Sequence, residues 1–352
     1  MSAGLVDRTV VAVFKAGRRP KPPDEVRRIL AEATAALTFY EVRGWLDDPS
    51  TMFAAPGPPG DASLIRQRRS GLAYEHLSFE SGYEPQAGEP GRDRWLARQA
   101  NRTAHAWIVR HREPRPWLVC IHGAGMGYPS AEFSAFRASW LHDELGLNLA
   151  FPVLPLHGPR RDGWGVVAAF PGDEPLDSIH AVAQAVWDVR RVIGWIHAQG
   201  DHTVGLSGLS LGGYISAVVA GVEDGVACVI AGIPAVDFAE LTTGHAPSRF
   251  LRRSDYRALS DMGPNLYRVI SPLVLTPRVP RERRFIFAAL ADRVVPPERQ
   301  AARLWAHWDK PRICWFNGGH VGFLRSPQVR AFVQEALARS GLIDDDWLET
   351  PP

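Results

Sequence analysis

The stretch HTVGLSGLSLGGYISAVVAG, residues 202–221, holds the central motif of this chain. It joins an apolar run typical of a strand to one typical of a helix through the motif GLSLG at 208–212. A strand-to-helix turn that exposes a serine hydroxyl brings backbone segments close together, and glycine on either side tolerates that approach. The serine then lies at a helix N-terminus, where free N–H groups favour an anion. The motif predicts Ser210 as a nucleophile between the elbow glycines Gly208 and Gly212; the alternative is a turn without a catalytic role.

The run that ends in this serine is one of a series of short, continuous apolar runs. Such runs are typical of strands buried on both faces of a parallel sheet. Apolar residues at spacings of three and four between Ile179 and Ile196 predict a helix that packs on such a sheet. Strands that alternate with helices predict an α/β fold, with a mostly parallel, doubly wound sheet and helices on both faces. The other runs are 117–123, 147–156, 226–233, 284–292 and 312–320.

The N-terminal part differs in composition from the rest. Residues 24–46 predict a helix, and the stretch PGPPGDAS at 56–63 predicts a loop or linker. Alternating residues at 72–83 and 104–112 predict two antiparallel strands. We therefore expect a helical appendage with linker at 1–70 and a catalytic domain at 71–345. Polar, arginine-rich residues 238–283 interrupt the alternation and predict a cap insertion.

An acid and a base are expected after the nucleophile, each just beyond a strand. Asp292 ends the run RFIFAALAD, and His320 ends RICWFNGGH. We predict His320 as the general base and Asp292 as the acid that orients it. Asp237, which follows the run VACVIAGI, is the alternative acid.

The loop after the strand at 117–123 is expected to supply the oxyanion hole. His122-Gly123-Ala124-Gly125 brings small residues to the strand end, so the N–H of Gly123, Ala124 or Gly125 joins that of Leu211 as a donor. The spacing of these glycines also suggests a dinucleotide-binding loop. That alternative is weaker because the next glycine comes one position early and no acidic residue ends a second strand about 20 residues on.

Two further segments are candidates for contact with substrate. His157, Arg160 and Arg161 end the run LPLHGPRR; the alternative for these arginines is a salt bridge beneath the rim. In the insertion, Arg252 and Arg253 belong to a largely basic set that suits an anionic head group; the alternative is a structural lid whose arginines meet solvent or neighbouring acids. The residues proposed to line an acyl channel there are Phe250, Leu251, Tyr256, Leu259, Met262, Leu266 and Tyr267.

Composition limits the other classes of function. A net charge of +2 gives little support for nucleic-acid binding. Three cysteines inside apolar runs predict buried, reduced thiols. The apolar run at 10–14 is too short for a signal sequence, and no stretch has the length of a transmembrane helix. We expect a cytoplasmic protein without an integral membrane segment.

The chain from about 72 to 340 resembles the α/β-hydrolase superfamily. The motifs CIHGAGMG, LPLHGPRR, GLSGLSLGGYIS and LTTG are similar to those of the branch that contains abhydrolase domain-containing protein eighteen. The wider resemblance implies a serine hydrolase (an esterase, lipase or thioesterase) that cleaves a carboxylic ester, thioester or amide without metal or organic cofactor. The narrower one implies an acyl-lipid-like substrate, and we expect the partner to be a small-molecule or lipid acyl ester. The rival hypotheses are a non-catalytic binding protein on the same fold and a nucleotide-dependent oxidoreductase.

Overall fold

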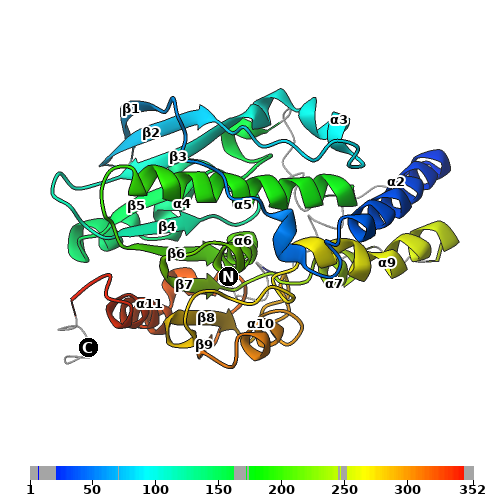
Figure 1. Ribbon diagram of the computed structural model, residues 1–352. Helices are drawn as coiled ribbons and strands as arrows, with labels where there is room; N and C mark the ends of the chain where they lie inside the picture. Colours follow the sequence, from blue (N-terminus) through cyan, green and yellow to red (C-terminus); the bar gives the residue numbers. More distant parts are fainter. Residues whose placement is uncertain are drawn as a thin grey trace.

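A single nine-stranded sheet forms the centre of the computed structural model, which describes residues 7, 21–69, 71–161, 172, 174–244, 246 and 252–344. The strand order is β1-β2-β3-β5-β4-β6-β7-β8-β9 (Figure 1). Neighbouring strands from β5 to β9 run parallel, whereas β1, β2, β3 and β5 pair antiparallel. The strands are β1 (Ser63–Arg69), β2 (Leu72–Glu80), β3 (Thr103–Val109), β4 (Trp117–Ile121), β5 (Asn148–Pro152), β6 (Val204–Leu209), β7 (Val226–Gly232), β8 (Arg284–Ala289) and β9 (Arg312–Phe316).

The apolar runs form the parallel part of this sheet. Every residue of β4, β5, β6 and β7 is buried, as expected for strands covered on both faces. Alternate residues of one strand enter different cores: Val119 belongs to one apolar cluster and Cys120 to the other. All three cysteines are buried and free. The predicted, mostly parallel sheet is confirmed.

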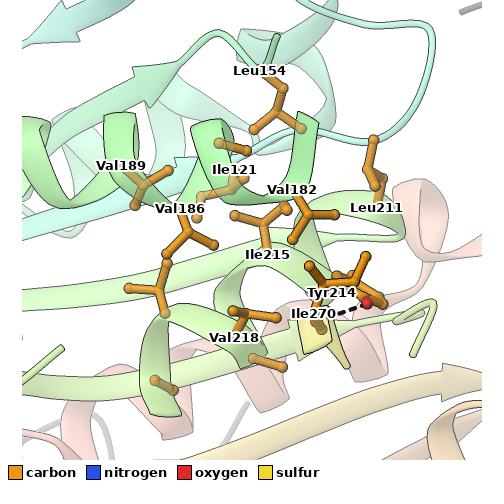
Figure 2. Close-up of a cluster of buried hydrophobic side chains, with 14 of the residues drawn as sticks. Ile121, Leu154, Val182, Val186, Val189, Leu211, Tyr214, Ile215, Val218 and Ile270 are labelled. Atoms are coloured by element: carbon orange, nitrogen blue, oxygen red, sulfur yellow. Dashed lines mark hydrogen bonds between the residues drawn. The ribbon is translucent and has the colours of Figure 1, made fainter. Parts of the chain in front are cut away.

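Helices cover both faces of the sheet. On one face, Val182, Val186 and Val189 of α5 (Pro175–His197) pack against α6 (Leu211–Val222), as Figure 2 shows. Residues of α4 (Pro129–Ala135) and α11 (Pro327–Arg339) belong to the core of the opposite face. The predicted apolar face between Ile179 and Ile196 is thus the buried face of α5. Further elements are α3 (Arg92–Leu96), α10 (Ala301–His307), η1 (Pro49–Met52), η2 (Gln99–Arg102), η3 (Trp140–Glu144), η4 (Gly158–Arg160), η6 (Arg281–Arg283) and η7 (Gly322–Arg325).

Strand β1 was not expected from the sequence. All seven of its residues are exposed, so it carries no apolar alternation, and its charged residues are typical of an edge strand. It pairs with β2 along its whole length. The sheet therefore begins at Ser63, ahead of the predicted boundary at residue 70, and the division into appendage and catalytic domain stays a prediction.

The insertion packs against the N-terminal helix. Helix α9 (Ser254–Leu266) lies beside α2 (Pro23–Val42), and the two project together from the sheet (Figure 1). The backbone N–H of Lys21 donates to the Tyr256 hydroxyl at 2.8 Å, which ties the start of α2 to α9. The insertion also holds α7 (Phe238–Gly244) and η5 (Tyr267–Ile270). Among the described residues, no helix is both long enough and apolar enough to cross a membrane.

Candidate active site

Ser210 occupies a strained turn between β6 and α6. Its φ of 55° lies in the left-handed region, which is unusual for a residue other than glycine. The flanking glycines are required by space: a Cβ on Gly208 would lie 2.1 Å from the Gly212 carbonyl oxygen. A Cβ on Gly212 would lie 1.8 Å from the carbonyl oxygen of Ile121. The elbow is therefore pressed against the end of β4, which carries the predicted oxyanion loop.

Ser210, His320 and Asp292 form a continuous hydrogen-bonded chain. The Ser210 Oγ lies 3.0 Å from His320 Nε2, and His320 Nδ1 lies 2.7 Å from Asp292 Oδ2. The other carboxylate oxygen, Oδ1, accepts hydrogen bonds from the N–H groups of Val294 (2.9 Å) and Val295 (2.8 Å). Asp292 follows β8 and His320 follows β9, so adjacent parallel strands deliver the acid and the base to the edge where β6 delivers the serine.

The alternative acid, Asp237, is engaged elsewhere. Its Oδ1 accepts the N–H of Glu240 at 2.9 Å at the start of α7, and its Oδ2 pairs with Arg303. The structure therefore brings Asp292, and not Asp237, to His320.

Asp7 also contacts this site and was not expected from the sequence. Its carboxylate accepts the backbone N–H of His320 at 3.0 Å and that of Arg293 at 3.1 Å, and the residue is 1% exposed. A Cβ on Gly319 would lie 2.6 Å from this carboxylate, which explains a glycine directly before the histidine. No local pattern marks Asp7, because it lies 313 positions from His320 in the chain.

His122 holds the loop that follows β4. Its Nδ1 lies 2.8 Å from the Gly123 carbonyl oxygen, and its Nε2 accepts the N–H of Leu154 at 3.0 Å. These partners place the ring proton on Nδ1. Burial lowers the pKa of His122 to about 3, so the ring stays neutral. His122 is thus a fixed support for the loop.

Gly127 and Gly158 allow two backbone segments to come into direct contact. A Cβ on Gly127 would lie 2.6 Å from the Gly158 nitrogen, and one on Gly158 would lie 2.1 Å from the Gly127 oxygen. The CIHGAGMG and LPLHGPRR motifs therefore pack directly against each other. This contact accounts for the glycine at 127 without a dinucleotide.

The residues at 157–161 have different surroundings. Arg160 is fully buried; its guanidinium donates to the carbonyl oxygens of Val153 and Asn101, both at 2.9 Å, and pairs with Asp188 at 2.8 Å. These contacts match the alternative interpretation, a salt bridge beneath the rim. His157 is also buried and donates from Nδ1 to the Pro155 oxygen at 2.9 Å, and burial lowers its pKa to about 4. Arg161 is half-buried.

The candidate substrate-binding residues of the insertion differ in burial and in their partners. Arg252 is exposed, whereas Arg253 pairs with Asp255 at 2.6 Å and stacks over the Tyr256 ring. Leu266 and Tyr267 belong to the buried core, and Leu259 and Met262 pack against it. Phe250 and Leu251 lie outside the described residues. Within the described part of the chain, no group of three His, Cys, Asp or Glu residues is placed to hold a metal ion.

Comparison with known proteins identifies relatives of this chain. It is 48% identical over 340 residues to the uncharacterized proteins MT2702 and Rv2627c of Mycobacterium tuberculosis, covering 96% of this chain and 82% of each relative. No family model matches the chain.

Solved structures with the same fold include esterases. The acetyl xylan esterase from Paenibacillus sp. R4 matches with a TM-score of 0.56 at 15% identity, over 87% of this chain and 93% of that one. Acetyl xylan esterase 1 from Thermoanaerobacterium sp. JW/SL YS485 matches with a TM-score of 0.55 at 16% identity, over 85% and 93%. At this level of identity the likeness shows the shared fold. The chain has the α/β-hydrolase fold and belongs to the same protein family as the mycobacterial proteins MT2702 and Rv2627c.

Proposed function

We propose that this protein is a serine hydrolase that cleaves a carboxylic ester or thioester through an acyl-enzyme. The observation that carries the proposal is the chain of hydrogen bonds from Ser210 through His320 to Asp292, on an elbow with a positive φ. A serine, a histidine within hydrogen-bond reach and a carboxylate that orients the histidine are the parts that nucleophilic acyl transfer needs.

The reaction follows from the positions of the protons. Asp292 holds the Nδ1–H of His320, so the Nε2 lone pair faces the Ser210 hydroxyl. Nε2 takes the hydroxyl proton as Oγ attacks the acyl carbonyl carbon, and then gives that proton to the leaving alcohol or thiol. Water next attacks the acyl-enzyme, loses its proton to Nε2 and releases the carboxylic acid as Oγ regains a proton.

We assign the oxyanion donors to the N–H groups of Leu211 and Ala124. Leu211 is the first residue of α6, where a helix leaves its N–H groups without partners inside the helix. The Gly123 carbonyl points at the His122 ring, and in a planar trans peptide the following N–H, that of Ala124, points the opposite way. A Cβ on Gly123 would lie 3.5 Å from Ser210 Cβ, so this peptide adjoins the nucleophile.

For the substrate we propose an acyl ester with an apolar acyl chain. The resemblance to the branch of abhydrolase domain-containing protein eighteen supports a lipid-like acyl group, with residues 238–283 as the cap. Arg161 and Arg252 remain the candidates for an anionic head group, since Arg160 and Arg253 are engaged in ion pairs. The esterases that share the fold favour the other possibility, a short acyl group such as acetyl.

The test is covalent labelling with a fluorophosphonate probe, followed by hydrolysis of p-nitrophenyl esters from acetyl to palmitoyl. We expect Ser210→Ala to abolish both labelling and hydrolysis. Asp292→Asn should lower kcat by roughly 10⁴-fold. Its matched control, Asp237→Asn, should keep near-normal turnover because Asp237 bonds to Glu240 and Arg303.

Two results would contradict the proposal. Labelling that persists in Ser210→Ala, or moves to the buried Ser207, removes Ser210 as nucleophile. A wild-type protein that neither reacts with the probe nor turns over any ester favours the non-catalytic binding protein.

A further inference from the structure

A cavity of about 390 Å³ lies away from the triad. It is bordered by η1, the loop that follows β2 and one side of α5, and it opens to solvent. Its volume falls within the range typical of small-molecule sites, ~300–1,000 Å³.

The position of this cavity separates it from the proposed active site. Strands β3, β5 and β4 lie between β2, which leads into the cavity wall, and β6, which ends at Ser210. Four strand spacings of about 4.8 Å, roughly 19 Å in all, separate β2 from β6 across the sheet. None of the residues that line the cavity belongs to the triad or to the oxyanion loop.

Aromatic side chains form much of the wall, and other contacts fix their positions. Trp187 Nε1 donates to the Ser81 carbonyl oxygen at 2.7 Å, and the Tyr83 ring lies 6.3 Å from the Trp187 ring at an angle of 63°. Trp45 stacks on Tyr40 with ring centroids 5.6 Å apart. Rings held in this way offer preformed faces for an apolar or cationic group.

One carboxyl group, that of Glu89, belongs to the same wall. Glu89 is 4% exposed, and its Oε2 accepts the N–H of Gln86 at 2.9 Å. Its Oε1 has no hydrogen-bond donor among the described residues. His180 Nδ1 lies 3.6 Å from Glu89 Oε1.

His180 does not supply the missing donor. Its Nε2 lies 2.9 Å from the Pro90 carbonyl oxygen, so the ring proton is on Nε2 and Nδ1 is an acceptor. Burial lowers the pKa of His180 to about 4, so the ring is neutral near pH 7. When the Glu89 carboxyl group is ionised, a buried acceptor thus faces another acceptor, an arrangement that a donor from outside the chain would relieve. The terminal torsion of a glutamate is soft, so the carboxyl group can turn Oε1 toward the cavity.

We propose that this cavity is a second binding site, for a small organic amine with an aromatic body, whose ammonium group pairs with the Glu89 carboxylate while its ring packs against Tyr83 and Trp187. A carboxylate beside aromatic faces suits this class because the charge meets its counterion and the apolar body leaves water. A carboxylic acid or phosphate is disfavoured, since it would bring a like charge to Glu89. The proposal is independent of the hydrolase function.

The charge of Glu89 makes this binding depend on pH. Burial raises the pKa of Glu89 to about 7, with Arg43 acting in the opposite direction. The other groups that face Glu89 are His180 on α5, Tyr40 on α2 and Tyr83 in its own loop. Across pH 5–8 the side chains of His180, Tyr40 and Tyr83 stay neutral and the Arg43 guanidinium stays charged. Of this set of groups, Glu89 is therefore the one that changes charge.

The experiment measures the binding of tryptamine and of its neutral analogue tryptophol by isothermal titration calorimetry. At pH 8 we expect wild type to bind tryptamine, and to bind tryptophol about tenfold or more weakly. Between pH 8 and pH 5 the ionised fraction of a group with a pKa of about 7 falls roughly a hundredfold, and tryptamine affinity should follow it.

Variants separate the carboxylate from the rest of the wall. Glu89→Gln should lower tryptamine affinity to the level of tryptophol. The matched control, Glu84→Gln, changes a wall residue whose side chain is 65% exposed and should leave both affinities unchanged. Ala54→Trp, at an exposed position of the wall, should block both ligands without touching Glu89.

Three outcomes overturn the proposal: no tryptamine binding by wild type at millimolar concentration, equal binding of tryptamine and tryptophol, or unchanged tryptamine affinity in Glu89→Gln. Probe labelling at Ser210, or circular dichroism if the protein is not labelled, shows that each variant is folded. If Glu89→Gln does not fold, the pH dependence of wild type and the Ala54→Trp variant test the proposal. Tryptamine affinity that is the same from pH 5 to pH 8, or that is unchanged in Ala54→Trp, overturns it.

Discussion

Replacing Arg160 by methionine tests whether this residue is structural or contacts substrate. The side chain is fully buried, and its guanidinium serves two carbonyl oxygens and the Asp188 carboxylate. Methionine fills similar volume but leaves Asp188 without its counterion. Burial already raises the pKa of Asp188, even though Arg160 opposes that shift.

The expected cost comes from these contacts. Removing one partner of a buried ion pair destabilises a protein by about 3–5 kcal/mol. That is a large share of a typical unfolding free energy of ~5–15 kcal/mol. In urea unfolding at pH 8, the free energy of unfolding of Arg160→Met should therefore be lower than that of wild type by about 3–5 kcal/mol. The double variant Arg160→Met/Asp188→Leu should recover much of the loss because no charge remains buried there.

The control is Arg161→Met, at the half-buried neighbour, which should change the unfolding free energy by less than about 0.5 kcal/mol. A stable Arg160→Met protein with a raised KM for anionic esters would refute the structural assignment. An Arg160→Met/Asp188→Leu protein that is no more stable than Arg160→Met would also refute the structural assignment.

Three further predictions concern the nucleophile elbow, the Asp7 side chain and the cavity. Gly212→Ala should abolish fluorophosphonate labelling, because the new Cβ would lie 1.8 Å from the Ile121 oxygen; wild-type labelling rates would contradict the elbow geometry. Asp7→Ala should lower kcat while leaving KM nearly unchanged, because the Asp7 carboxylate accepts the His320 N–H at 3.0 Å. Asp7→Asn keeps an acceptor and should restore part of the rate. Equal kcat in wild type and both variants would show that Asp7 does not position His320. Glu89→Gln should raise the unfolding free energy by up to about 3 kcal/mol at pH 8 and by little at pH 4. Folding moves the pKa of Glu89 from 4.5 to about 7, so the wild-type protein loses stability as pH rises through that window, whereas the variant does not. A gain that is the same at both pH values would contradict the buried carboxyl group.

The sequence determined the parallel part of the sheet and the nucleophile elbow because both are local. Continuous apolar runs are needed wherever a strand is covered on both faces, and each predicted run became a strand. Gly208 and Gly212 are needed wherever a serine is exposed at a strand-to-helix turn. The order of Asp292 and His320 after Ser210 was also visible in the chain. Strand β1 escaped prediction because its residues are exposed on both faces and carry no apolar pattern.

Which polar groups meet depends on how the elements pack in three dimensions. It placed Asp292 at His320 and turned Asp237 to Arg303, although both aspartates follow a strand. It buried Arg160 against Asp188, and it brought Asp7 to the backbone of His320 from the far end of the chain. Hydrogen bonds and ion pairs form between groups a few ångströms apart in space, whatever their separation in sequence. Local patterns therefore predict the elements and the residue types of the site, while the packing of those elements decides the partners.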